Sequence, residues 1–101
     1  MVKEINGLAE LNEVVKNNNK VLVDVWAPWC GPCRMLGPVV EKVADTTEGL
    51  VTVKVNLDEN DDVAEKFGIE AIPTLLVFNN NELVNKTVGF IPEAKVRELV
   101  K

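Results

Sequence analysis

Apolar and polar residues recur along this chain with two different periods, and the two periods predict different elements. In residues 51–57 every second residue is apolar, which is the pattern of a β-strand with one buried face. In residues 8–15 and 32–46 the apolar residues recur every three or four positions, the spacing of an amphipathic helix. Asn6 is a suitable N-cap for the first of these helices, and the second contains Pro38. These patterns predict one strand and two helices.

One apolar run shows neither period. Residues 21–27, VLVDVWA, are apolar except for Asp24, which is too continuous for a strand with one face in water. A central strand covered on both faces, as parallel βαβ units require, accounts for this run. Asp24 is then a carboxyl group in a buried strand, a position that needs its own explanation.

Turn-forming residues divide the rest of the chain into short elements. We expect strands over 2–5, 74–78 and 82–88, and helices over 60–67 and 92–101. Gly68 is the expected C-cap of the helix before it, and Pro92 suits the first turn of the last helix. The three asparagines 79–81 can adopt left-handed backbone conformations, which predicts a hairpin between the last two strands.

The expected order of elements is β-α-β-α-β-α-β-β-α. Strands that alternate with helices before a late hairpin predict the α/β class, with a mixed central β-sheet and helices on both of its faces. No internal repeat, low-complexity tract or linker interrupts the 101 residues, so we expect a single domain over residues 1–101.

Charge and hydropathy argue against two classes of partner. The chain has 11 Lys and Arg against 16 Asp and Glu, a formal net charge of −5, which repels phosphate backbones and anionic lipid headgroups. No apolar run approaches the length of a membrane span, and polar residues interrupt the start of the chain where a secretory signal needs an apolar stretch. We therefore expect a cytoplasmic protein that binds neither nucleic acid nor membrane.

The only two cysteines, Cys30 and Cys33, lie in the stretch WAPWCGPCRM where a helix is expected to begin. Their spacing can bring both sulfurs to one side of the first turn, within disulfide range. Zinc or an iron–sulfur cluster normally needs four ligands, and the chain has no histidine, so a metal remains possible only as a bridge between two chains.

Two further interpretations compete with redox cycling. A permanent disulfide is unexpected in a reducing cytosol, and closing so short a loop contributes only about 2 kcal/mol. Inert core cysteines fit poorly beside Gly31 and Pro32 at an exposed helix start. The pattern therefore favours a pair that cycles between dithiol and disulfide, with no cofactor and no metal.

The position of the two cysteines also predicts which of them reacts first. Backbone N–H groups and the dipole at a helix N-terminus favour the thiolate on the outermost cysteine, Cys30. Cys30 is expected to attack a partner's disulfide and form a mixed disulfide. Cys33 then attacks Cys30 and releases the reduced partner.

Four stretches of the chain, VDVWAPWCGPC, KVNLDEN, GIEAIPTLLVF and VGF, resemble the thioredoxin family in their order and spacing. The resemblance extends from Val2 to the last residue. It implies the thioredoxin fold and the activity of a protein-disulfide reductase, a monomeric electron carrier in cell redox homeostasis. The implied partners are disulfide-containing target proteins and a thioredoxin reductase that recharges the carrier with electrons from NADPH.

The resemblance gives roles to two residues behind the cysteines. Asp24 is similar to a buried aspartate of the family, whose desolvated carboxyl has a raised pKa and accepts the proton of Cys33. Lys54 falls where the family has a lysine that tunes this aspartate. The alternatives are a partly solvated or capping role for Asp24 and a solvent-facing position for Lys54.

Four other residues are implied to bind targets: Trp29, Ile72, Pro73 and Gly89. Ile72 and Pro73 resemble a loop with a cis peptide bond that faces the cysteines and can pair with a substrate strand. A trans proline at the start of a strand is the alternative. Gly89 resembles a glycine that lets a partner chain approach closely, and otherwise it marks a bulge. Trp26 is expected to belong to the core.

Gly31 and Pro32 between the cysteines indicate the direction of the reaction. Proline carries no N–H, and no histidine lies between the cysteines, so few donors stabilise the thiolate. A less stabilised dithiol is a better reductant, which favours reduction of targets. One alternative function stays open, an interaction subunit in which the same target-binding surface around the cysteines binds one fixed partner and redox cycling is incidental.

Overall fold

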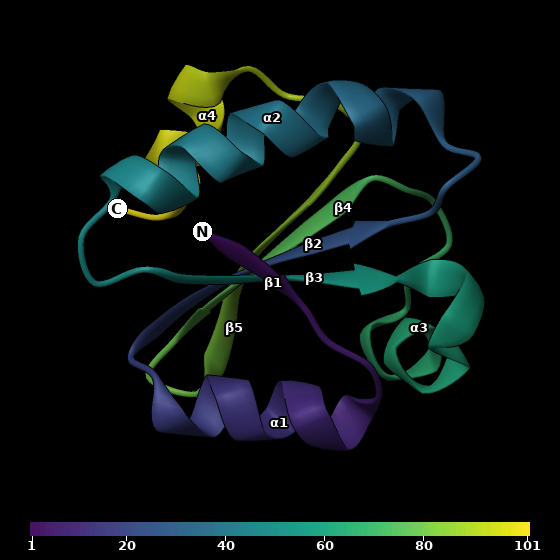
Figure 1. Ribbon diagram of the computed structural model, residues 1–101. Coiled ribbons are helices and arrows are strands. Elements are labelled where there is room, and N and C mark those ends of the chain that lie inside the picture. Colours follow the sequence, from purple (N-terminus) through teal and green to yellow (C-terminus); the bar gives the residue numbers. More distant parts are fainter.

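The computed structural model describes all residues 1–101, and its centre is a five-stranded sheet in the order β1-β3-β2-β4-β5 (Figure 1). The strands are β1 (Val2–Glu4), β2 (Lys20–Trp26), β3 (Val51–Asn56), β4 (Thr74–Asn79) and β5 (Glu82–Val88). The strands β1, β3 and β2 run parallel, whereas β4 is antiparallel to β2 and to β5. The sheet is therefore mixed, as the order of elements predicted.

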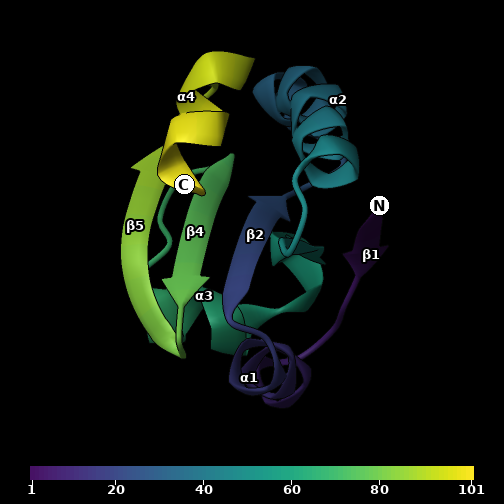
Figure 2. The same ribbon diagram turned by 90° about the vertical axis from the view of Figure 1, so that its left-hand side faces the viewer.

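Helices cover both faces of this sheet. They are α1 (Leu8–Asn17), α2 (Gly31–Thr46), α3 (Asp61–Phe67) and α4 (Glu93–Leu99), with one turn of 3-10 helix, η1 (Leu57–Glu59), after β3. The helices α2 and α4 lie on one face, and α1 and α3 lie on the other (Figures 1 and 2). No helix combines the length and the apolar character needed to cross a membrane.

The strand β2 is the centre of both hydrophobic cores. Val21, Val23 and Val25 belong to the core under α1 and α3, whereas Leu22 belongs to the core under α2 and α4. Alternate side chains of one strand point to opposite faces, so a strand buried on both faces must be apolar throughout. The prediction of a doubly covered strand is confirmed. Asp24 is the buried exception on the α2 face.

Two local predictions about turns are also confirmed. Gly68 is the C-cap of α3 with a φ of 62°, a left-handed conformation that suits glycine. Asn80 and Asn81 have φ values of 51° and 68° in the turn between β4 and β5. The hairpin therefore uses asparagine where two left-handed residues are needed.

The predicted N-cap of α1 is wrong. Gly7 is the N-cap residue of α1, and it has no side chain that could accept a hydrogen bond from the first amides of the helix. Two residues from the α3 region satisfy the free amides instead, because Asn60 accepts a hydrogen bond from the Gly7 N–H at 2.6 Å and Asp62 accepts one from the Leu8 N–H at 2.8 Å. A distant segment thus supplies what the local sequence was expected to supply.

Several other boundaries differ from the prediction by a residue or two, among them the end of β3 and both ends of the last helix. The strand β3 ends at Asn56, one residue early, because the Asn56 side chain accepts a hydrogen bond from the Asp58 N–H at 3.0 Å and starts η1. The last helix is shorter than 92–101. Pro92 is its N-cap, and the helix ends at Leu99.

Candidate active site

The cysteines lie where three segments of the fold meet. The chain leaves β2 at Trp26 and enters α2 at Gly31, so the loop between them sits at the carboxyl end of the central strand. The parallel neighbour β3 ends at the same edge, and the antiparallel β4 begins there at Thr74. The carboxyl ends of parallel strands are a common location for functional sites in α/β folds.

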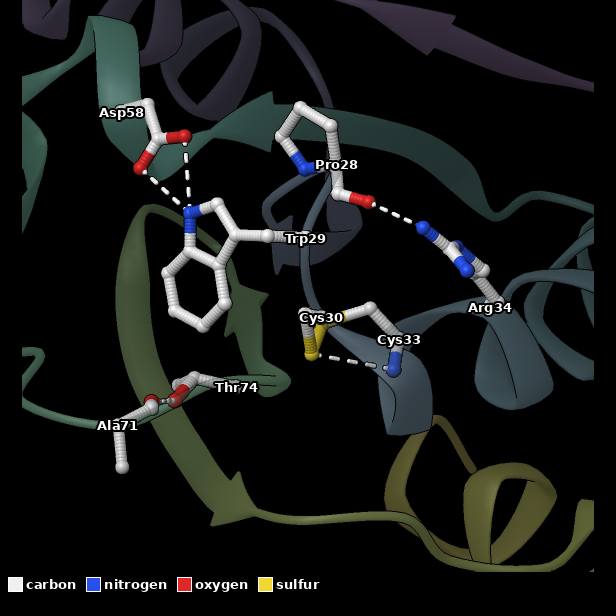
Figure 3. Close-up of a disulfide and its surroundings, with 8 residues drawn as sticks. All are labelled: Pro28, Trp29, Cys30, Cys33, Arg34, Asp58, Ala71 and Thr74. Carbon is white, nitrogen blue, oxygen red and sulfur yellow. Dashed lines mark hydrogen bonds between the residues drawn. A yellow bond between two sulfur atoms is a disulfide. The ribbon is translucent and has the colours of Figure 1, made fainter.

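Cys30 and Cys33 form a disulfide, with a Cα–Cα distance of 5.3 Å. Cys30 is the N-cap of α2, and its Sγ accepts a hydrogen bond from the Cys33 N–H at 3.2 Å (Figure 3). Cys30 is 4 % exposed and Cys33 is 6 % exposed, whereas the intervening Gly31 and Pro32 are exposed. The sulfurs are therefore more enclosed than the sequence suggested. The same N–H and the helix dipole favour a thiolate at Cys30 once the bond is reduced.

Asp24 lies on β2, on the face that α2 covers, and is 5 % exposed. Burial raises the pKa of Asp24 to about 6 from an ordinary value of 3.8, and the positive charge of Lys54 opposes that rise. Its Oδ1 has no hydrogen-bond partner in the chain. Asp24, Lys54 and Cys33 all line one groove of about 820 Å³ beside α2. The carboxyl group and the inner cysteine thus share one cavity.

Lys54 is half-buried on β3, directly beside Asp24 in the parallel register. Its ammonium lies 4.8 Å from the centre of the Trp26 ring. None of the three ion pairs in the structure includes Lys54. Lys54 is therefore neither a freely solvated residue nor a direct ion-pair partner of Asp24.

The predicted target-binding residues lie around the disulfide. Trp29 is 66 % exposed, and Ile72 packs against the cluster formed by Ala27, Cys30 and Cys33. The Ile72–Pro73 peptide bond is cis, as expected from the resemblance. The Gly89 N–H donates a hydrogen bond to the Pro73 carbonyl at 2.8 Å, and Gly89 has a φ of 95°. The one irregularity of the β4–β5 pairing lies at Val77 and Phe78, so Gly89 is not a bulge.

Three residues at the site were not assigned a functional role from the sequence. Asp58 accepts hydrogen bonds from the Trp29 indole N–H at 3.0 and 3.1 Å (Figure 3). Arg34 donates to the Pro28 carbonyl at 2.8 Å. Trp26, expected in the core, is half-buried and lies under Lys54. A usable signal existed for Asp58, because a residue just after β3 must lie near the end of its parallel neighbour β2.

The residues gathered here define a class of protein. No group of three or more His, Cys, Asp or Glu side chains is arranged to hold a metal ion. The site has two sulfurs at a helix N-terminus that are close enough to form a disulfide, and a buried carboxyl group lines the same groove. This arrangement is typical of a thiol–disulfide oxidoreductase.

Comparison with known proteins identifies the family. A sequence model of thioredoxin matches residues 3–101. A thioredoxin of Mycoplasma pneumoniae is 41 % identical over 100 residues, which cover 99 % of this chain and 98 % of that protein. Thioredoxin 1 of Nostoc sp. is 47 % identical over 90 residues, covering 88 % and 84 % of the two chains. The structure of a mutant thioredoxin from Halobacterium salinarum superposes with a TM-score of 0.93 at 38 % identity, covering 98 % and 87 %.

This chain belongs to the thioredoxin family and has the thioredoxin fold. It is a general protein dithiol–disulfide oxidoreductase that acts through the Cys30–Cys33 pair. Membership in the family implies a reductase as one partner and disulfide-containing proteins as targets.

Proposed function

We propose that this protein reduces disulfides in many target proteins, with Cys30 as the nucleophile and Cys33 as the resolving cysteine. The Cys30 thiolate attacks one sulfur of the target, the target disulfide breaks, and a mixed disulfide forms as the other target sulfur leaves as a thiolate. The Cys33 thiolate then attacks Cys30, which releases the second target sulfur and closes the disulfide within the chain. The hydrogen bond from the Cys33 N–H to the Cys30 Sγ carries this assignment, because it marks Cys30 as the sulfur that the helix start stabilises.

Asp24 accepts the proton of Cys33 in this proposal. The two side chains line the same groove, and a carboxyl group with a pKa of about 6 is a suitable base near neutral pH. Lys54 tunes Asp24 through its positive charge from the neighbouring strand. Each catalytic cycle oxidises two thiols to one disulfide, and a thioredoxin reductase returns the two electrons.

Targets dock on the rim formed by Trp29, Ile72, Pro73 and Gly89. The backbone N–H and C=O of Ile72 make no hydrogen bond within the chain, so an extended segment of a target can pair with them. Trp29 offers an exposed aromatic face beside the sulfurs. These contacts need few specific side chains on the target, which suits a broad range of substrates.

Gly31 and Pro32 favour reduction of targets over their oxidation. Both are exposed, and Pro32 offers the sulfurs no N–H, so few donors stabilise the reduced pair and the protein works as a reductant. We also propose that residues 1–101 act as a single-domain monomer in the cytoplasm. The reducing conditions there keep the pair available for another cycle.

Reduction of insulin by dithiothreitol tests the proposal. The wild type is expected to accelerate precipitation of the insulin chains, and Cys30→Ser is expected to abolish the acceleration. Cys33→Ser keeps the nucleophile and lacks the resolving thiol, so it is expected to accumulate a mixed disulfide with insulin that mass spectrometry detects. Turnover by Cys30→Ser would show that the assignment is wrong, as would a mixed disulfide on Cys33 in that variant.

A further inference from the structure

The ammonium of Lys54 contacts an aromatic ring although two carboxylates are its neighbours in the sheet. In the parallel register, Glu4 of β1 and Asp24 of β2 flank Lys54 on either side. Neighbours in register point to the same face of a sheet, so all three side chains lie on the α2 side. The cation nevertheless lies 4.8 Å from the centre of the Trp26 ring and forms no ion pair with either neighbour.

Packing holds the Trp26 ring in place. Trp26 is the last residue of β2, is half-buried, and packs against the cluster of Ala27, Cys30 and Cys33. Its indole N–H is buried and has no hydrogen-bond partner in the chain. The ring is thus placed by its neighbours beside the sulfurs. Such a ring can attract an ammonium group through its negative face.

Lys54 is the cation in the groove with no ionic or hydrogen-bonded partner. The other charged groups that line the groove are Arg34, Glu41, Lys42 and Asp45, all from α2. Lys42 pairs with Glu93 at 3.3 Å, Asp45 pairs with the amino terminus, and Arg34 donates to the Pro28 carbonyl. Whether Asp24 acquires a direct ionic partner therefore depends on where the Lys54 ammonium is held.

We propose that Trp26 is a positioning residue whose ring holds the Lys54 ammonium away from the Asp24 carboxyl group and leaves that group unpaired in the groove beside Cys33. The consequence for catalysis rests on the proposed role of Asp24 as proton acceptor. A direct ion pair would favour the charged carboxylate and make it a weaker base. The ring lets the lysine stay near without forming that pair.

A double-mutant cycle tests this role. In Trp26→Leu the lysine is free to reach Asp24, so the pKa of the Asp24 carboxyl, measured by carbon NMR titration of the oxidised protein, is expected to fall by about one unit or more. The acid limb of the pH profile for insulin reduction is expected to move down with it. Trp26→Phe keeps a weaker ring face and is expected to give a smaller change. In a Lys54→Met background, Trp26→Leu is expected to leave the Asp24 pKa nearly unchanged.

Two results of the cycle would overturn the proposal. An equal fall in the Asp24 pKa with and without Lys54 would show that Trp26 acts by packing alone, and no change in either background would show that the ring does not control the lysine. Should Trp26→Leu fail to fold, the cycle is run with Trp26→Phe. Failure of the proton-acceptor role has a different signature, because Asp24→Asn would then leave the rate of insulin reduction unchanged while the NMR cycle still showed coupling.

Discussion

Replacing Asp24 with asparagine tests the free-energy cost of ionising a carboxyl group inside the sheet. Asp24 is buried with an unpartnered Oδ1, and burial raises its pKa to about 6, against 3.8 when unperturbed. Because the folded state has the higher pKa, it binds this proton more tightly than the unfolded state does. The contribution of Asp24 to the free energy of unfolding is therefore largest below pH 4, and it decreases as the pH rises from about 4 to about 6.

The size of the decrease follows from the two pKa values. They differ by about 2.2 units, and each unit is worth about 1.4 kcal/mol, so ionisation of Asp24 lowers the free energy of unfolding by about 3 kcal/mol above pH 6. Asparagine has no proton to lose. Asp24→Asn is therefore expected to be more stable than the wild type by up to about 3 kcal/mol at pH 7, with the difference shrinking towards pH 4.

Guanidinium unfolding of the oxidised wild type and of Asp24→Asn, at intervals from pH 4 to pH 8, measures this difference. Other groups titrate alike in the two proteins, so subtracting the two curves isolates Asp24. Oxidation removes the cysteines from the titration. A difference that stays constant across this range would refute the buried, raised-pKa assignment. If the wild type instead became more stable relative to the variant as the pH rose to neutral, the pKa of Asp24 would be lowered by folding and not raised.

Four further substitutions test the packing and the rim. Gly37→Ala is expected to raise the free energy of unfolding by about 0.5–1 kcal/mol, because Gly37 lies within α2 and open space surrounds the added methyl group. Leu36→Ala is expected to lower it by about 2–5 kcal/mol, because Leu36 is fully buried under α2. Gly89→Ala is expected to lower it by about 1–2 kcal/mol, because a φ of 95° strains any residue with a Cβ. Guanidinium unfolding checks all three, and an unchanged midpoint in any of them would contradict the reason given. Asp58→Asn weakens the hydrogen bond that orients Trp29, so the KM for insulin is expected to rise by about twofold to fivefold with little change in kcat, and a fall in kcat alone would show another role.

Local patterns predicted most of the fold because they report on packing within a few residues. The run 21–27, apolar except for Asp24, identified the central strand, and Asn80 and Asn81 identified the hairpin turn. The N-cap of α1 was missed for the opposite reason. Asn60 and Asp62 accept hydrogen bonds from the amides at that helix start, and they lie more than fifty residues further along the chain.

In the candidate site, too, the sequence predicted the features that depend on local patterns and missed those that depend on distant contacts. The spacing of Cys30 and Cys33 before a helix predicted a disulfide-forming pair, which the structure contains. The anomaly of Asp24 in an apolar strand predicted a buried carboxyl group, which the structure also contains. Lys54 was expected near Asp24 only from the resemblance. Its contact with Trp26 was not predicted, because that contact depends on how β2 and β3 align.

The amino-acid sequence alone determined the order of the elements, the helix start that carries the two sulfurs, and the carboxyl group in the central strand. Those features depend on neighbours within one turn or one strand, so periodicity and spacing reveal them. Only the tertiary structure decided that the oxidised sulfurs are enclosed, that Asp58 holds Trp29, and that Lys54 lies on a ring instead of a carboxylate. Those contacts join segments far apart in the chain, and strand register and helix placement set them.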